Sequence, residues 1–403
     1  MTDRTGLLGD RPFRLLWSSH VGSSFGDALT SLALLLTAQR LTGSTSAVAA
    51  TAIAIALPHL LVGLPAGVLV DRWNRRRVMI VSDLVRAVLV LGFLAVTTTD
   101  RLWLLCALAF VQSAVGTFFN PARAAFMAEL FPAERLLPAN SLLEMSRVVA
   151  GVAGVAAAGA LASTRADLSI VFVIDAATFL ASAVLIARIG ERAPQAPRIR
   201  AELGIGLRVI LGSRLLVGMV AAGAVAMLGL GAVNVLLVPF VVEDLGASEA
   251  WFGALEAAQV AAMVVAGSLV AVFAPRTRPT GLISAGAIGL GATVASIAAC
   301  GRPWHLMLLL FAAGSFVTPV QASATTILQT AVPAGLRGRV QATFATVISA
   351  ASLASMSLAG LAAGAVGIRP VFVAAGAIVG AAGVLSAAAF RGAERIVPAF
   401  GTN

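Results

Sequence analysis

The stretch that decides the fold reads GVLVDRWNRRR and covers residues 67–77. It closes an apolar run that begins near residue 46, and a second apolar run follows from residue 78. Each run is long enough for a helix to cross a bilayer, which takes about 20 residues. We therefore predict that the basic cluster between them is a short loop at a membrane surface that joins two transmembrane helices.

The composition of the whole chain agrees with a membrane protein. Of its 403 residues, 59% are hydrophobic and 11% are charged, against about 45–50% and about 25% in soluble globular proteins. This apolar content suffices for roughly twelve spans, and it excludes a soluble enzyme, a disordered chain and a secreted disulfide scaffold. The formal charge of +10 is carried by Arg alone. Because these charges are not clustered on one element, they do not indicate nucleic-acid binding.

The sequence lacks the signatures of catalytic and cofactor-binding sites. Cys106 and Cys300 match no metal or redox spacing, and we interpret both as buried thiols. No Walker loop, H-E-x-x-H motif or G-x-S-x-G motif is present. We therefore expect no enzyme activity, no cofactor, no metal and no ATP-driven pumping by this chain alone.

Twelve apolar segments are predicted to be transmembrane helices, which gives an all-α membrane protein. With the N-terminus placed in the cytoplasm, 19 Arg fall in inner segments and five in outer turns. Since cytoplasmic loops are enriched in Arg, we expect both termini in the cytoplasm. The predicted helices cover residues 13–39, 46–70, 78–99, 102–127, 139–163, 168–188, 212–242, 249–273, 280–299, 303–330, 338–364 and 370–390.

The longest internal connection, residues 190–211, divides the chain into two six-helix halves, 1–189 and 212–403. It contains two prolines and an amphipathic stretch that we expect to lie on the inner membrane surface. Residues of the first half recur in order in the second at offsets of about 200: Arg14-Leu15-Leu16 as Arg214-Leu215-Leu216, Pro121 as Pro319, Pro132 as Pro333 and Arg135 as Arg337. This indicates an old duplication, and parallel six-helix repeats are a recurring design of secondary transporters.

The opening loop resembles the G-x-x-x-D-R-x-G-R-[RK] signature of the major facilitator superfamily, with Asn74 in place of its Gly. Asn is the next most tolerant residue for a left-handed turn. Residues 13–17, 26–28, 120–123, 137–141 and 336–340 resemble the drug-efflux branch that includes macrolide and enterobactin exporters. The resemblance implies a twelve-helix alternating-access fold and export of small molecules, commonly driven by proton entry. The fifth helix departs from many proton antiporters because Gly151 is not followed by proline.

Asp27 is the strongest candidate for proton coupling. It lies about 14 residues into the first helix, where a carboxylate costs several kcal/mol unless it is neutralised or faces a water-filled cavity. That setting suits reversible protonation or binding of a cation, and a structural hydrogen bond within the bundle is the alternative. Glu256, with Gln259 one turn further along the helix, is a second candidate. The alternative for Glu256 is a solvated residue at the outer mouth.

A second set of charged residues is predicted to act as a gate. Asp71 ends the second helix, where the helix dipole repels an anion, so we expect it to pair near Arg337 and Arg339. Breaking this contact would bias inward against outward states, and a solvated loop charge is the alternative. Asp83 and Arg86 share a helix face and are predicted to pair, either within this gate or as a local structural pair. The set also includes the loop residues Arg72, Arg75 and Arg76.

Two further groups complete the candidates. We predict a salt network at the inner mouth, in which Arg123 and Arg147 pair with Glu129 and Glu144; substrate contact is the alternative. Four polar residues within spans are predicted either to line the substrate cavity or to form hydrogen bonds between helices: Gln112, Asn234, Gln259 and Gln321.

The leading hypothesis is an exporter of small amphipathic molecules that exchanges them for protons. Because the aromatic fraction is 6% and Tyr is missing, we expect Phe, Met and aliphatic cavity walls suited to loose hydrophobic recognition. The alternatives are a narrow-specificity metabolite or siderophore exporter and a non-transporting membrane sensor on the same fold. We expect a monomer in the plasma membrane of a bacterium, with a small-molecule substrate, protons and lipids as partners and no nucleic acid.

Overall fold

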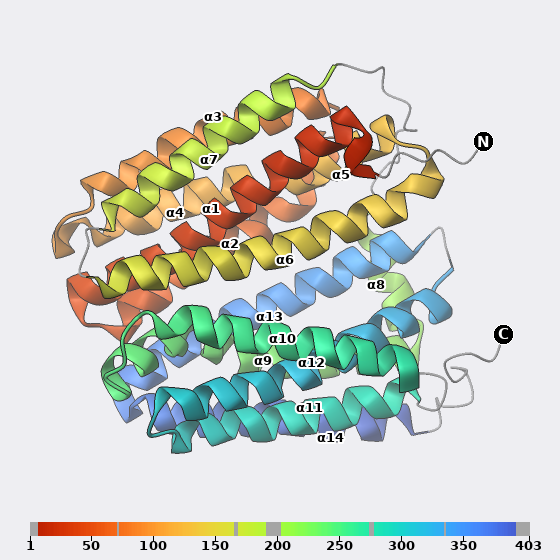
Figure 1. Cartoon of the computed structure of the whole chain (residues 1–403). Helices are drawn as coiled ribbons and strands as arrows, with labels where there is room; N and C mark the ends of the chain where they lie inside the picture. The colour runs from red at the N-terminus through yellow and green to blue at the C-terminus, as the bar shows by residue number, and fades with distance from the viewer. Residues whose placement is uncertain are drawn as a thin grey trace. The chain divides into compact units, whose positions relative to one another are not determined.

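The computed structural model describes residues 7–70, 72–164, 168–190, 203–273, 278–333 and 336–391. These residues are almost entirely helical and include no strand. Twelve helical segments among them are long and apolar enough to cross a membrane, which confirms the predicted all-α fold (Figure 1). The helices are α1 (Arg11–Thr42), α2 (Thr45–Val70), α3 (Arg75–Gly92), α4 (Leu102–Gly116), α5 (Phe119–Leu130), α6 (Ala133–Ser163), α7 (Ser169–Ala187), α8 (Leu203–Leu211), α9 (Arg214–Pro239), α10 (Trp251–Phe273), α11 (Pro279–Ser296), α12 (Pro303–Ala331), α13 (Arg337–Val366) and α14 (Ile368–Phe390).

The chain divides into two compact units. Unit 1 contains residues 1–43 and 54–200, and unit 2 contains residues 44–53 and 201–403. The first turns of α2 therefore group with unit 2 and the rest of the helix with unit 1. The sequence-based division into 1–189, a linker at 190–211 and 212–403 stays a proposal. Within that linker the structure describes residue 190 and α8.

The two units repeat one order of helix packing. In unit 1, α1 packs against α6 and α7, and α3 packs against α7. In unit 2, α9 packs against α13 and α14, and α11 packs against α14. The first span of each unit thus contacts its fifth and sixth spans, and the third contacts the sixth. This repetition is the one expected of two duplicated six-helix halves.

Close backbone contact joins α1 to α6 in unit 1. A Cβ added at Gly154 of α6 would collide with the carbonyl oxygen of Phe25 and would lie 3.0 Å from the Cβ of Ala28, both on α1. Small residues allow this approach, which membrane helices use because apolar side chains gain little by leaving lipid. The contact lies beside Asp27, so it helps to fix the position of that residue.

The fourth predicted span, residues 102–127, is not one continuous helix. α4 ends at Gly116 and α5 begins at Phe119. Pro121 accounts for the break, because it has no N–H to donate to the carbonyl of residue 117 and its ring crowds that carbonyl. In unit 2, Pro319 lies within α12 without ending the helix, so the two units differ at this point.

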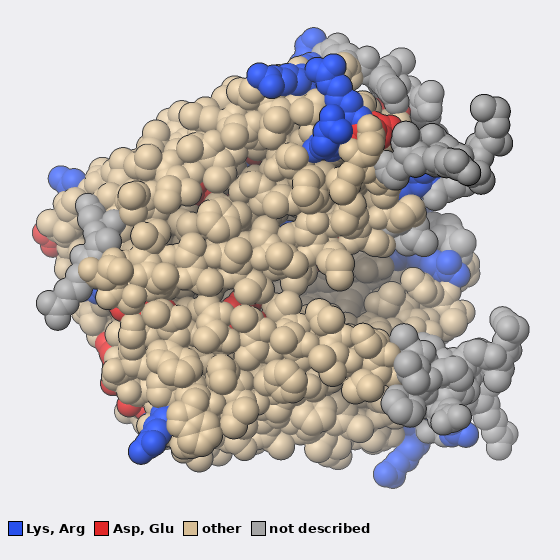
Figure 2. Space-filling model, viewed as in Figure 1, with Lys and Arg blue, Asp and Glu red and all other residues tan. Residues whose placement is uncertain are grey.

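The exposed flanks of the helices are apolar. Val88, Trp103 and Leu361 are 69–72% exposed. In Figure 2 the helix flanks in view are almost free of charged side chains, which gather near the helix ends. Flanks of this kind need contact with lipid chains. The chain is therefore a multi-pass membrane protein, while the inside and outside assignment of its loops stays a prediction.

Candidate functional site: a polar cavity in unit 1

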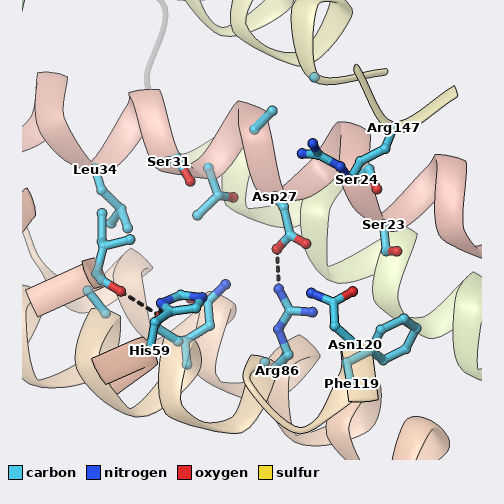
Figure 3. A pocket seen from close by; sticks show the side chains of 18 of the residues that line it. Ser23, Ser24, Asp27, Ser31, Leu34, His59, Arg86, Phe119, Asn120 and Arg147 are labelled. Carbon is cyan, nitrogen blue, oxygen red and sulfur yellow. Dashed lines mark hydrogen bonds and ion pairs between the residues drawn. The ribbon is translucent and has the colours of Figure 1, made fainter. Parts of the chain in front are cut away.

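A cavity of about 370 Å³ opens among α1 to α6 of unit 1 (Figure 3). Its polar lining residues are His20, Ser23, Ser24, Asp27, Thr30 and Ser31 of α1, His59 of α2, Arg86 of α3, Gln112 and Ser113 of α4, Asn120 of α5 and Arg147 of α6. Leu34, Ile55 and Phe119 are among its apolar lining residues. The cavity therefore offers hydrogen bonds and charges beside apolar surface, and the expected Phe, Met and aliphatic walls stay a prediction.

Asp27 and Arg86 form an ion pair at the cavity wall, in which Nη2 of Arg86 donates to Oδ1 of Asp27 (Figure 3). The side chain of Asp27 is 42% exposed, whereas that of Arg86 is 9% exposed. The guanidinium carbon of Arg86 also lies 4.0 Å from the centre of the Phe179 ring, a favourable cation–π contact. The carboxylate of Asp27 is thus open to the cavity, whereas the side chain of Arg86 is largely buried.

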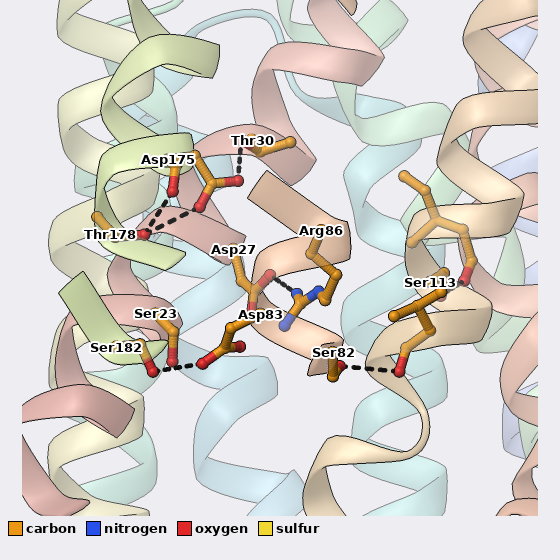
Figure 4. A network of polar contacts seen from close by, with 12 residues as sticks. Ser23, Asp27, Thr30, Ser82, Asp83, Arg86, Ser113, Asp175, Thr178 and Ser182 are labelled. Atoms are coloured by element: carbon orange, nitrogen blue, oxygen red, sulfur yellow. Dashed lines mark hydrogen bonds and ion pairs between the residues drawn. The ribbon is translucent and has the colours of Figure 1, made fainter. Parts of the chain in front are cut away.

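Arg86 pairs with Asp27 on α1 and not with Asp83 on its own helix, which corrects the predicted pair within α3. Asp83 is fully buried and accepts a hydrogen bond of 2.6 Å from the hydroxyl of Ser182 on α7 (Figure 4). A spacing of three residues brings two side chains to one face but does not make them pair. Here the neighbouring helices α1 and α7 supply a separate partner for each residue.

A third buried acid, Asp175 of α7, ties α7 to α1. Its Oδ2 accepts a hydrogen bond of 2.6 Å from Thr30, and its Oδ1 accepts one of 3.1 Å from Thr178 (Figure 4). Asp175 is fully buried and, like Asp83, is not among the residues that line the cavity. Asp27 is therefore the carboxylate of this cluster that a solute in the cavity can reach.

The predicted salt network at the inner mouth forms in part. Within α6, Arg147 donates to Glu144 through Nε at 3.0 Å and through Nη2 at 2.5 Å. Glu129 pairs with Arg75 of α3 at 2.9 Å. It does not pair with Arg123, because six residues on one helix place the two side chains on different faces. The Nε of Arg123 is buried without a hydrogen-bond partner among the described residues.

The start of α3 is fixed by local capping and by α7. Asn74 has a φ of −68°, and its side chain accepts a hydrogen bond of 3.0 Å from the backbone N–H of Arg77. Asn74 is therefore a helix N-cap, and the left-handed turn that we considered for this position is wrong. Arg76 donates to the carbonyls of Ile186, at 3.2 Å, and Ala187. These carbonyls end α7, where a helix dipole favours a cation.

The rest of the predicted gate stays a proposal. Asp71 lies outside the described residues. Arg72 is exposed in the loop before α3. Arg337 begins α13 and donates from Nε to the carbonyl of Val332 at 3.0 Å, while Arg339 is half-buried two residues further along.

Most of the other predicted cavity residues belong to unit 2. Glu256 and Gln259 are half-buried on α10, Asn234 is exposed on α9, and Gln321 is exposed on α12. Among the four predicted polar residues, Gln112 lines the cavity of unit 1. It is 7% exposed, and its buried Oε1 has no hydrogen-bond partner among the described residues.

Eight of the twelve polar residues of the cavity wall were not among the predicted site residues, and three of these eight are His59, Ser113 and Asn120. The hydroxyl of Ser113 donates to the carbonyl of Ile55 at 2.6 Å and lies 3.3 Å from Nδ1 of His59. Each of the three is a polar residue inside an apolar run, the same signal that identified Asp27. Hydroxyl and imidazole groups also form hydrogen bonds with the backbone carbonyls of helices. A polar residue inside an apolar run therefore does not by itself distinguish a cavity wall from a structural hydrogen bond.

Twelve apolar helices in two repeated six-helix units, with an ion pair in a polar cavity, define a membrane transporter of the major-facilitator type. The sequence profile of the Major Facilitator Superfamily matches residues 16–226 and again 219–400. The chain therefore belongs to the major facilitator superfamily.

Relatives of this chain include proteins named for efflux. Macrolide efflux protein A of Streptococcus pyogenes is 22% identical over 377 residues, 91% of this chain and 93% of that protein. A protein of Bacillus amyloliquefaciens named as a bacilysin exporter, BacE, is 35% identical over 123 residues, 30% of each chain. The uncharacterised transporter YfiS of Bacillus subtilis (strain 168) is 33% identical over 172 residues, 42% of this chain and 40% of that one. The last two matches thus cover less than half of those relatives.

Solved structures share the fold at low sequence identity. The peptide transporter POT matches with a TM-score of 0.80 and 14% identity, over 98% of this chain and 96% of that one. A bacterial homologue of the lysosomal transporter Spinster, in an inward-facing conformation, matches with a TM-score of 0.75 and 14% identity, over 96% and 97% of the two chains. Both likenesses confirm the major-facilitator fold.

Proposed function

We propose that this transporter is a secondary exporter of small molecules that works by alternating access and is driven by proton entry. The observation that carries the proposal is the Asp27–Arg86 ion pair, whose carboxylate is open to a polar cavity inside an apolar bundle. Ionisable groups at such depth are costly, so they mark functional pathways more often than they mark stabilising contacts. The efflux names of the relatives support the direction of transport.

The ion pair suggests how a proton and a substrate compete. A proton on Asp27 removes the negative charge that balances Arg86. The buried guanidinium then needs another acceptor, because an unpaired charge in a site of low dielectric costs several kcal/mol. A substrate carbonyl, hydroxyl or carboxylate in the cavity can supply it. Because proton and substrate act on the same pair, each biases the equilibrium between inward and outward states.

The proposed substrate is a small amphipathic natural product that carries several hydrogen-bonding groups. The hydroxyl, amide and imidazole groups of the cavity wall suit such a compound. An exporter of narrow specificity is the second candidate. It is favoured by the fixed donors and acceptors of the wall, because a site built to hydrogen-bond its ligand strongly rejects compounds that lack those groups.

The remaining parts of the proposal rest on the sequence. Glu256 of α10 assists in proton coupling, and Asp71 forms a gate with Arg337 and Arg339. Both termini lie in the cytoplasm of a bacterium, as the Arg distribution predicts, and the protein acts as a monomer in the plasma membrane. Rocking of the two halves exposes the substrate site to one side and then to the other.

The test uses the full chain in proteoliposomes with an imposed pH gradient. Macrolides and dipeptides are first screened by thermal stabilisation, and a compound that stabilises the protein is used for transport. Asp27→Asn should abolish transport driven by the gradient and retain exchange of labelled for unlabelled substrate. Asp175→Asn is the matched control, because it neutralises a buried acid that does not line the cavity. If Asp27→Asn responds to the gradient as the unmodified protein does, Asp27 does not carry the proton.

A further inference from the structure

A second hollow, of about 660 Å³, lies on unit 1 where α3 begins and α4 ends. It shares no lining residue with the polar cavity. Apolar residues form most of its wall: Val78, Val81 and Val85 of α3, Val115 of α4, and Phe118 in the turn between α4 and α5. The three α3 valines recur at helical spacing and form one stripe about 10 Å long. This groove therefore has the shape and chemistry to hold a hydrocarbon chain.

One end of the groove is positively charged. Arg72 and Arg77 line it on either side of the N-cap Asn74, and both are exposed. The described residues that line the groove include no acidic residue. Trp73 stacks on Phe118 with their ring centres 6.2 Å apart and an angle of 28° between the rings. An exposed Trp beside Arg is typical of the level of lipid headgroups, so the charged end of the groove lies at that level.

We infer that this groove binds one anionic phospholipid, with its phosphate between Arg72 and Arg77 and one acyl chain along the valine stripe. Guanidinium groups match the geometry of phosphate oxygens. The hydroxyl of Ser82 does not compete, because it donates to the carbonyl of Val115 at 3.1 Å within the wall.

The two arginines select among lipids by the charge of the headgroup. The valine stripe distinguishes a lipid from a free phosphate. A choline headgroup carries an ammonium that the two arginines repel, whereas a glycerol headgroup leaves the phosphate as the net charge. A soluble phosphate would contact the charged end and leave the valine stripe in contact with solvent or detergent. A lipid satisfies both ends of the groove, so the occupant is a lipid and not a free phosphate.

The test counts lipids bound to the purified full chain by native mass spectrometry. The probes are dioleoylphosphatidylglycerol, dioleoylphosphatidylcholine and glycerol 3-phosphate. We expect one phosphatidylglycerol to bind on the order of 10- to 30-fold more tightly than phosphatidylcholine, from two arginines near the headgroup, and we expect no displacement by glycerol 3-phosphate. The double variant Arg72→Gln/Arg77→Gln should lose this preference. Val81→Trp, at a position 57% exposed, should fill the stripe and weaken binding with both arginines in place.

The matched control is the double variant Arg208→Gln/Arg391→Gln. It removes the same net charge at two exposed positions outside the groove and should bind phosphatidylglycerol as the unmodified protein does. Melting temperatures in phosphatidylcholine check that every variant is folded. Equal binding of the two lipids, equal losses in the two double variants, or displacement by glycerol 3-phosphate would each overturn the lipid site.

Discussion

Gly154 tests whether close contact between α1 and α6 fixes the wall that carries Asp27. A Cβ at this position would overlap the carbonyl oxygen of Phe25 and would lie 3.0 Å from the Cβ of Ala28 and 3.1 Å from the backbone nitrogen of Leu29. Backbone atoms cannot turn aside as a side-chain tip can, so the two helices must separate by roughly 1 Å to restore van der Waals contact. Overpacking of this kind costs about 1–3 kcal/mol. Gly154→Ala should therefore lower the melting temperature and weaken binding of substrate.

Gly151→Ala provides the matched control. Gly151 lies about one turn earlier on α6 and lines the cavity, and a Cβ added there meets no atom within 4 Å. In this variant, replacement of a helical Gly should gain about 0.5–1 kcal/mol, so the melting temperature should stay constant or rise. Thermal unfolding of the two purified variants in one detergent, followed by tryptophan fluorescence, makes the comparison. Equal shifts in the same direction would refute steric contact between α1 and α6 as the cause.

Three further outcomes follow from individual side-chain contacts. Thr30→Val removes the donor to the buried carboxylate of Asp175 and should cost about 1–3 kcal/mol, read as a lower melting temperature; an unchanged value would mean that the carboxylate finds another donor. Arg369→Gln removes the 2.7 Å contact with Asp244, an exposed pair worth about 1 kcal/mol or less, and raising the salt concentration should shrink the difference from the unmodified protein. Burial raises the pKa of the Cys300 thiol, so maleimide should label it slowly at pH 7 and rapidly once heat unfolds the chain; fast labelling of the folded protein would contradict its burial.

The sequence by itself determined the spans and their number. In lipid every backbone polar group must bond within its own helix, so an apolar run of about 20 residues is sufficient to specify a span. The same logic identified Asp27, because a carboxylate inside such a run needs a cavity or a partner. A proline within a span is expected to kink or break its helix, and Pro121 follows the break between α4 and α5. The sequence does not say which proline ends its helix, since Pro319 in a comparable segment of unit 2 leaves its helix continuous.

The partners of the charged residues that pair between helices were decided by the tertiary structure. Arg86 has Asp83 three residues away on its own helix, but it pairs with Asp27, 59 residues distant in the chain. Glu129 likewise pairs with Arg75 of another helix. A sequence fixes which side of a helix a residue occupies. It does not fix which helix packs against that side or at what height along the axis, because these depend on how the side chains of both helices interlock.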